Sequence, residues 1–241
     1  MALYDMLAPH YDMVTGDSAA EAAFVRDIIK RRHGRAETVL DVACGTGAIT
    51  APLSRTYQVS GLDIAPGMLA VARAKLPAGT PLYLADMTSF DLDVRFDAIV
   101  CAYQGVNHLL SAAAWQSFFG CAHRHLNADG ILVFDIATVG HLTAMAATTR
   151  IVEQFGANYL QIRVRTADGV LFEWHIEIFE LQPDGTYRLL TQVIELRSFP
   201  VERIREALRP WFAGIEVITD SDSSADPDGA GRLWLACAKT A

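Results

Sequence analysis

Short apolar runs alternate with amphipathic stretches between residues 38 and 136. Each run has the length of a strand, and in the stretch after it apolar side chains return every three or four positions, as in a helix. Strands that alternate with helices predict a parallel sheet covered by helices on both faces. The expected strands are residues 38–43, 57–62, 81–85, 96–102 and 130–136, and the expected helices are residues 18–33, 48–56, 66–76 and 111–125.

Residues that begin or end helices support two of these assignments. Ser18 and Glu21 have the spacing of a capping box, and Gly34 follows the last expected position of the first helix. Pro66 falls in the first turn of the third helix, where proline is favoured. These residues predict where both helices begin.

The hydrophobic pattern changes to a period of two after about residue 150. Residues 170–178, with Trp174 at the centre, alternate apolar and polar side chains, which predicts a half-exposed antiparallel strand. Similar strands are expected at residues 158–166 and 187–197, and Asp-Gly turns join the three. We expect the apolar face of this small sheet to pack on the main sheet or on a second subunit, with a lid over a bound substrate as the alternative.

The last part of the chain returns to the first pattern. A helix is expected at residues 200–208, and strands are expected at residues 214–219 and 233–238. Residues 220–231 between these strands are rich in Ser, Asp and Gly, which predicts a mobile loop.

These elements predict one doubly wound α/β domain with an antiparallel β insertion after its fifth strand. The main domain comprises residues 1–145 and 198–241, and residues 1–33 form an N-terminal helical cap on it. The insertion comprises residues 150–197 and provides a lid or a dimer surface.

Composition and charge narrow the class of protein. The 241 residues carry a formal net charge of −8, which disfavours a nucleic-acid partner. No apolar stretch is long enough to cross a bilayer, and the first residues lack the features of a signal peptide. The four cysteines form no CxxC pair, which argues against a zinc site or a disulfide framework. We therefore expect a soluble cytoplasmic protein with reduced thiols.

The first strand ends in a glycine-rich turn. Gly45 and Gly47 allow a ligand to approach the backbone, but Thr50 stands where dinucleotide-binding loops have a third small residue. Asp41 adds a carboxylate at this turn, and no Lys or Arg is near. A carboxylate there opposes a pyrophosphate and favours a ligand with an ammonium group and a positive sulfur. S-adenosylmethionine has both groups and no phosphate.

Further acidic residues follow the next two strands. Asp63 ends the second strand and is placed to accept hydrogen bonds from ribose hydroxyls, although a helix cap is the alternative. Asp86 ends the third strand, where it could meet the amine of adenine, with Met68 and Met87 lining the ring. Ligands of open α/β sheets bind at the carboxyl ends of the strands, so these residues are expected to converge.

These segments resemble the motifs of class I S-adenosylmethionine-dependent methyltransferases. The resemblance implies a seven-stranded sheet of order 3-2-1-4-5-7-6 with an antiparallel seventh strand. It also implies S-adenosylmethionine as cofactor, S-adenosylhomocysteine as product, and Tyr11, Ala43, Ile64 and Ala102 as further cofactor-binding residues. The matching segments are Val39–Gly47, Gly61–Leu69, Ala85–Thr88, Phe96–Cys101 and Leu126–Asp135.

The surrounding segments are similar to small-molecule N-methyltransferases, including amino-sugar N,N-dimethyltransferases and, more distantly, glycine N-methyltransferase. In the amino-sugar enzymes, a tyrosine near the N-terminus and a histidine after strand four lie beside the acceptor nitrogen, and Tyr4 and His108 match them. The Asn-His pair here departs from the Gly-His or Asn-Tyr of many relatives, which leaves the substrate open. His108, with an ordinary pKa of roughly 6.5, could take a proton from the amine, and Tyr4 or Tyr11 could orient it.

The sequence therefore predicts methyl transfer to a small-molecule acceptor, most readily an amine nitrogen. The alternatives are an O-methyltransferase, a catalytically silent cofactor-binding scaffold, and an NAD-dependent enzyme, which Asp41 and Thr50 disfavour. No carboxylate cluster with metal-ligand spacing occurs in the sequence, so no metal is expected. A homodimer is compatible with an exposed apolar sheet face.

Overall fold

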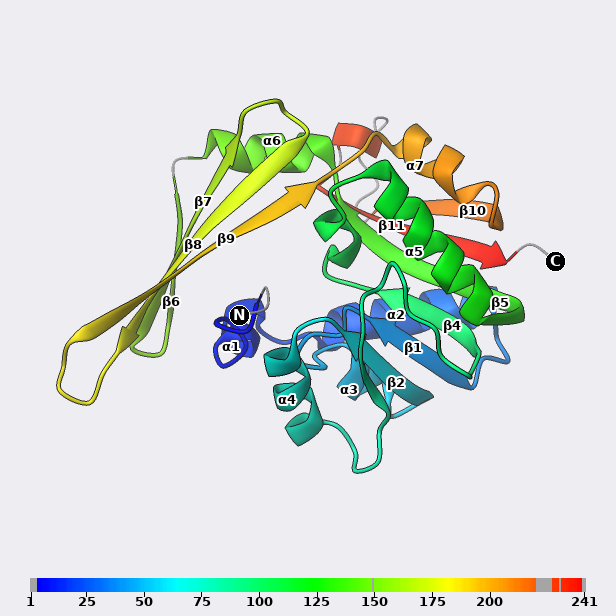
Figure 1. Cartoon of the computed structure of the whole chain (residues 1–241), viewed down its shortest axis with the longest axis horizontal. Helices are drawn as coiled ribbons and strands as arrows, with labels where there is room; N and C mark the ends of the chain where they lie inside the picture. The colour runs from blue at the N-terminus through cyan, green and yellow to red at the C-terminus, as the bar shows by residue number, and fades with distance from the viewer. Residues whose placement is uncertain (1–3, 149, 220–226, 230, 240–241) are drawn as a thin grey trace.

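A seven-stranded sheet forms the centre of the computed structural model, which describes residues 4–148, 150–219, 227–229 and 231–239 (Figure 1). Its strand order is β3-β2-β1-β4-β5-β11-β10, and only β11 runs antiparallel to its neighbours. The predicted order and the antiparallel last strand are thus confirmed. The strands are β1 (Thr38–Val42), β2 (Gln58–Asp63), β3 (Leu82–Leu84), β4 (Phe96–Cys101), β5 (Leu126–Ala137), β10 (Phe212–Thr219) and β11 (Arg232–Lys239).

Helices cover both faces of this sheet. One face packs against α5 (Ala112–His125) and α7 (Val201–Leu208), and the other packs against α2 (Ala19–Arg32) and α3 (Thr50–Leu53). α4 (Pro66–Lys75) follows β2 and begins at the predicted proline. Successive side chains of a strand point to opposite faces, so every buried strand feeds both layers.

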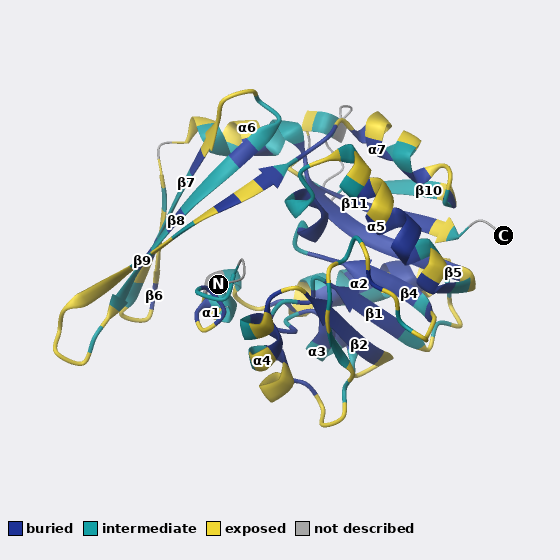
Figure 2. Cartoon of the chain, in the orientation of Figure 1, coloured by how far each residue is buried: buried dark blue, intermediate teal, exposed yellow. Residues whose placement is uncertain are grey.

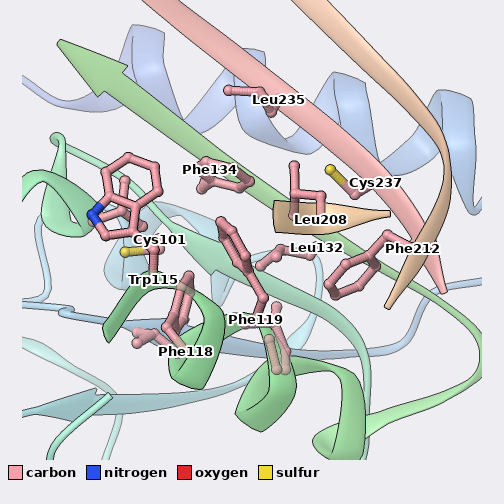
Figure 3. Close-up of a cluster of buried hydrophobic side chains, with 14 of the residues drawn as sticks. Cys101, Trp115, Phe118, Phe119, Leu132, Phe134, Leu208, Phe212, Leu235 and Cys237 are labelled. Atoms are coloured by element: carbon pink, nitrogen blue, oxygen red, sulfur yellow. The ribbon is translucent and has the colours of Figure 1, made fainter. Parts of the chain in front are cut away.

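Aromatic side chains fill the core between the sheet and α5. Trp115, Phe118 and Phe119 of α5 are buried against Phe134 of β5 (Figure 3). Phe119 and Phe134 have ring centroids 5.6 Å apart. This packing fixes the central strands, whose carboxyl ends carry the site.

Two helix predictions were wrong in detail. The helix expected at residues 48–56 is reduced to the four residues of α3, with turns on both sides. Ser18 does not cap α2 through its side chain. Its hydroxyl accepts a hydrogen bond from the Tyr103 hydroxyl at 2.7 Å, and Glu21 binds Arg232. Contacts with Tyr103 and Arg232, which are distant in the sequence, thus take the place of the expected capping hydrogen bonds.

The fifth strand begins four residues earlier than predicted. β5 starts at Leu126, which pairs with Phe96, and the register then shifts so that Ala98 pairs with Ile131. The residues between, Asn127 to Gly130, include Asn, Asp and Gly, which are common in turns. They are accommodated as an irregularity within the strand.

The insertion is a four-stranded antiparallel sheet that extends away from the main sheet (Figure 1). The three predicted strands are present, but β6 and the helix α6 (Val139–Ala147) were not predicted. β6 is a short edge strand with mostly exposed side chains, and α6 is almost uniformly small and apolar, so neither shows a clear period. The strands are β6 (Ile151–Phe155), β7 (Asn158–Thr166), β8 (Leu171–Leu181) and β9 (Tyr187–Arg197).

The apolar face of the insertion packs on the N-terminal segment and on α6. Ile176 and Ile178 cluster with Leu7, whereas Phe172 clusters with Leu142 of α6. Among the described residues, its contact with the main sheet is limited to Ala137 at the end of β5, so packing on that sheet was wrong for most of the face. The expected second subunit stays a prediction. Buried residues of the insertion lie mainly towards the main domain, while its far end is mostly exposed (Figure 2).

Hydrogen bonds join the two ends of the insertion to the main domain. The Asn107 amide donates to the carbonyl oxygens of Ala137 at 3.2 Å and Arg197 at 3.0 Å, and its Oδ1 accepts from the Ala137 N–H. The Ser198 hydroxyl also donates to the Ala137 carbonyl, at 2.7 Å. The chain therefore leaves and rejoins the main domain at one place.

Among the described residues, no helix combines the length and the apolar character needed to cross a bilayer. The loop predicted at residues 220–231 falls mostly outside the described residues. Its described part contains a short 3-10 helix, Pro227–Gly229.

Candidate active site

The glycine-rich turn and Asp63 form one hydrogen-bonded unit at the carboxyl ends of β1 and β2. The Asp63 carboxylate accepts from the Gly45 N–H and the Ala65 N–H, both at 2.8 Å. Ala43 and Gly45 adopt left-handed backbone conformations, with φ of 56° and 55°. Only glycine adopts this region without cost, so Gly45 suits a turn that exposes its backbone. Burial raises the pKa of Asp63 although these N–H groups oppose the shift.

A cavity of about 100 Å³ opens beside this turn. It also contacts Tyr4, Tyr103, Gly105 and His108, which come from the N-terminal segment and from the segment after β4. The predicted cofactor residues that line it are Tyr11, Ala43, Gly45, Asp63, Ile64, Met68, Met87 and Ala102.

Three predicted cofactor residues do not line this cavity. Asp41 is buried and accepts a hydrogen bond from the Thr50 hydroxyl at 2.6 Å, and burial raises its pKa to about 7. Gly47 packs towards Leu76 of the α4 C-terminus. Asp86 is exposed, and its Oδ1 accepts from the backbone and hydroxyl of Thr88. In this conformation, the carboxylates of Asp41 and Asp86 and the backbone of Gly47 thus stabilise the local fold.

A second cavity, of about 170 Å³, lies against the first. Tyr4, Tyr11, Tyr103 and His108 line both cavities and so form the wall between them. The remaining residues that line it are Leu7, Thr15, Gln104, Leu160, Ile162, Trp174, Ile176 and Leu196. The structure therefore brings together all three predicted catalytic residues, Tyr4, Tyr11 and His108.

Tyr4 and His108 are hydrogen bonded within this wall. The Tyr4 hydroxyl lies 3.1 Å from His108 Nε2, and the two rings meet edge to face with centroids 5.4 Å apart. Burial lowers the pKa of His108 to about 4, and the backbone of Glu195 only partly opposes this shift. Burial also raises the pKa of Tyr4 well above its usual value. Near neutral pH the phenol is therefore the donor and the neutral imidazole the acceptor.

The segment after β4 holds His108 in place through its backbone. Tyr103 and Gln104 both have left-handed conformations, with φ of 55° and 59°. Such conformations are costly for residues other than glycine and persist only when their surroundings enforce them. The Gln104 N–H donates to Asp135 Oδ1 at 2.9 Å, and Asn107 is the amide that bridges β5 and β9.

Asp135 belongs to a buried ion network behind this segment. Arg232 Nε lies 2.5 Å from Asp135 Oδ2, and Arg232 Nη1 lies 2.9 Å from Glu21. The guanidinium also stacks over Tyr103, 5.5 Å from its ring centroid. Burial raises the pKa of Asp135, and Arg232 opposes the shift. β11, β5 and α2 thus jointly support a wall residue of both cavities.

Several contacts hold the N-terminal segment across the site. Asp12 binds Lys75 Nζ and the Thr46 hydroxyl, each at 2.5 Å. His10 lies 3.1 Å from the Glu180 carboxylate of β8. Tyr4 and Tyr11, the latter at the start of α1 (Tyr11–Thr15), are thereby held between the main domain and the insertion.

The lining of the first cavity fits S-adenosylmethionine. Asp63 offers a carboxylate to a ribose diol, and Met68 and Met87 offer apolar surface to a flat base. The rings of Tyr4 and Tyr11 present faces that attract a positive sulfonium. Among the described residues, no Lys or Arg lines either cavity, as suits a cofactor without phosphate.

Several lining residues were not predicted from the sequence. Tyr103 directly precedes the segment that contains His108, which was expected to contact the acceptor. This position in the sequence was the signal that could have identified it as a lining residue. Leu160, Ile162 and Leu196 come from the insertion, and their alternation gave only their shared face. Which surface that face would meet could not be derived from the period.

No described group of three or more His, Cys, Asp or Glu side chains is placed to hold a metal ion.

Comparisons with known proteins identify the type of domain. A methyltransferase domain model matches residues 39–130. A dTDP-3-amino-3,6-dideoxy-α-D-glucopyranose N,N-dimethyltransferase of Streptomyces fradiae is 33% identical over 134 residues, which cover 54% of this chain and 52% of that protein. The match thus spans about half the length of this relative.

Solved structures match over nearly the whole chain. A methyltransferase of Clostridium acetobutylicum superposes with a TM-score of 0.84 at 20% identity, covering 99% of both chains. An S-adenosylmethionine-bound amino pentose methyltransferase of Micromonospora echinaspora has a TM-score of 0.75 at 27% identity, covering 95% of this chain and 94% of its own. The chain thus carries a methyltransferase domain over residues 39–130, and its fold is that of the class I S-adenosylmethionine-dependent methyltransferases.

Proposed function

We propose that this enzyme transfers the methyl group of S-adenosylmethionine to the amine nitrogen of a small molecule. The observation that carries the proposal is the wall of Tyr4, Tyr11, Tyr103 and His108 shared by the two cavities. The shared residues show that the two cavities adjoin, as an in-line displacement requires, because the donor methyl and the acceptor lone pair must meet along one line.

In this proposal, the first cavity holds the cofactor, which supplies an activated methyl group on a positive sulfur. Asp63 accepts hydrogen bonds from the ribose hydroxyls, and Ile64, Met68 and Met87 enclose the base. The N-terminal segment covers the bound cofactor and excludes water. The cavity of about 100 Å³ is smaller than the roughly 300–1,000 Å³ typical of ligand sites, so the segment must shift to admit it.

The second cavity binds the amine in its neutral form. The described residues that line this cavity include no Asp or Glu that would stabilise an ammonium. Desolvation also lowers the pKa of an amine, so the neutral form is favoured there. Because the Tyr4 hydroxyl donates to His108, its oxygen lone pairs are free to accept an N–H from the amine. That contact would turn the nitrogen lone pair towards the donor methyl.

His108 positions Tyr4 and is not a strong base in this proposal. A histidine with a pKa of about 4 takes little of the proton from an ammonium near neutral pH. The positive charge that develops on the nitrogen is instead stabilised by the three tyrosine rings, and the proton leaves to solvent with the product.

The same lining favours an amine over a hydroxyl acceptor. An alcohol is a poor nucleophile until a base removes its proton, and His108 is the only described basic side chain in the second cavity. An acceptor cavity that adjoins the cofactor cavity also favours an enzyme over a silent scaffold.

Incubation with S-adenosylmethionine carrying a ¹³C methyl group and panels of small amines and alcohols tests the proposal. We expect N-methyl signals by NMR and stoichiometric S-adenosylhomocysteine with one or more amines. Turnover of alcohols alone, or no turnover by protein that binds the cofactor, would refute it.

Tyr4→Phe provides the variant, with Tyr159→Phe on the exposed face of the insertion as its matched control. Loss of one positioning hydrogen bond to the reacting group should lower kcat by about 10–100-fold in Tyr4→Phe. The affinity for S-adenosylmethionine should stay within about twofold, because the ring remains, and Tyr159→Phe should behave as wild type.

A further inference from the structure

The second cavity has a mostly apolar wall where the insertion forms it. The wall residues are Leu160, Ile162, Trp174, Ile176 and Leu196 of three adjacent strands. The indole N–H of Trp174 is the one polar group among these five side chains, and it is buried without a hydrogen-bond partner. Leu7 of the N-terminal segment extends this apolar wall. The tyrosines and His108 lie on the side that this cavity shares with the first one, and Gln104 and Thr15 add further polar groups to the lining.

The described linings of the two cavities contain no Lys or Arg that could receive a phosphate at this wall. Alternation along the strands puts Arg163 and its cross-strand partner His175 on the face opposite to Ile162 and Trp174. Arg197 Nη1 donates to the carbonyl of Leu110, at 3.1 Å. Among the described residues, the cavity linings contain a carboxylate, Asp63, and no Lys or Arg.

The cavity is also compact. Its volume of about 170 Å³ equals that of roughly six water molecules at liquid density. A ring with an amine fits such a space as it stands. Of several sugar hydroxyls placed against this wall, one could accept from the Trp174 indole N–H. The others would lose their water without gaining partners, which is unfavourable.

From the wall and the charge, we infer that the acceptor is an amine on a largely apolar body. It is not a nucleotide-linked amino sugar of the kind named for the Streptomyces fradiae relative. This inference rests on the proposed function, which supplies the amine. It adds that Leu160, Ile162, Trp174, Ile176 and Leu196 determine specificity through apolar contact.

Calorimetric binding to the protein saturated with S-adenosylhomocysteine tests the inference without requiring turnover. The probes are cyclohexylamine, glucosamine and dTDP-3-amino-3,6-dideoxyglucose. We expect cyclohexylamine to bind at least tenfold more tightly than either of the others. Tightest binding of the dTDP-sugar, tightest binding of glucosamine, or no binding of cyclohexylamine at millimolar concentration would overturn the inference.

Ile162→Thr tests the wall directly, with Val193→Thr as the matched control because Val193 is half exposed and pairs with His175 on the opposite face. The added hydroxyl and lost apolar surface should weaken cyclohexylamine binding about 3–10-fold in Ile162→Thr only. Equal effects in both variants would contradict the assigned role of the wall.

The two proposals fail in different ways. If cyclohexylamine binds best but no amine is methylated, the proposed function is wrong and the binding preference stands. If amines are methylated and the dTDP-sugar binds best, the proposed function stands and the inference is wrong.

Discussion

Replacement of Arg232 by methionine should destabilise the protein and loosen the wall between the two cavities. Arg232 is the counter-ion of Asp135, whose carboxylate is fully buried and holds the Gln104 N–H. Methionine keeps much of the apolar volume and removes the charge. The variant therefore leaves Asp135 as a buried carboxylate without its partner.

The size of the effect follows from that burial. Removal of one partner of a buried ion pair costs about 3–5 kcal/mol. For a chain of 241 residues the entropy of unfolding is about 0.5 kcal/mol per kelvin, so Tm should fall by about 6–10 °C. The double variant Arg232→Met, Asp135→Asn should recover most of this loss, because the asparagine Oδ1 still accepts the Gln104 N–H.

The loss should also depend on pH. The folded-state pKa of Asp135 is raised by burial, and removal of Arg232 raises it further. A carboxyl with a raised folded pKa disfavours folding above that pKa, and this penalty disappears as the pH falls and the group is protonated. The difference in Tm between wild type and Arg232→Met should therefore narrow from pH 8 to pH 5.

Differential scanning calorimetry of wild type, both single variants and the double variant at several pH values measures these quantities. A decrease in Tm of less than about 2 °C for Arg232→Met, or a difference that does not change with pH, would refute the reasoning. Turnover measured in parallel should be lower in Arg232→Met and closer to wild type in the double variant.

Three further predictions concern the site residues. Asp63→Asn should raise the Kd for S-adenosylmethionine by about 10–100-fold in calorimetry, since charge-assisted hydrogen bonds to the ribose become neutral ones; an unchanged Kd would remove Asp63 from the cofactor site. His108 should titrate in NMR with a pKa below 5, so its neutral burial adds stability above about pH 6.5 that is lost as the pH falls towards 4; a pKa of 6 or above would contradict this. Asn107→Leu should lower Tm by about 6 °C, because three buried hydrogen bonds to Ala137 and Arg197 are lost, and an unchanged Tm would show that they contribute nothing.

The periodic part of the fold could be predicted from the sequence because burial on one face leaves a repeat in the chain. The strands and helices of the main sheet follow this rule, and so do β7, β8 and β9. α6 and β6 do not, since α6 is apolar on nearly all sides and β6 is a short exposed edge. A helix or strand whose faces do not differ in hydrophobicity leaves no hydrophobic period in the sequence.

Within the site, residues tied to the backbone of the glycine turn could be predicted, and long-range partners could not. Gly45 and Asp63 are part of one local motif and lie together. Asp41 was expected at the ligand, but Thr50, nine residues away, takes its carboxylate. Thr50 was noted in the sequence only as a departure from a dinucleotide loop. The position of α3 in the folded chain brings the Thr50 hydroxyl to the Asp41 carboxylate.

The junction at Asn107 lies between the part of the chain that forms the first cavity and the insertion that completes the second cavity. The cofactor cavity is built by the main domain and N-terminal segment, while one wall of the second cavity is supplied by an excursion that starts after Ala137 and returns at Arg197. Segments whose ends lie close together can be exchanged without disturbing the host domain. The excursion can therefore be inherited or swapped as a cassette, so a lineage of such enzymes can acquire a new acceptor while its use of the methyl donor stays constant.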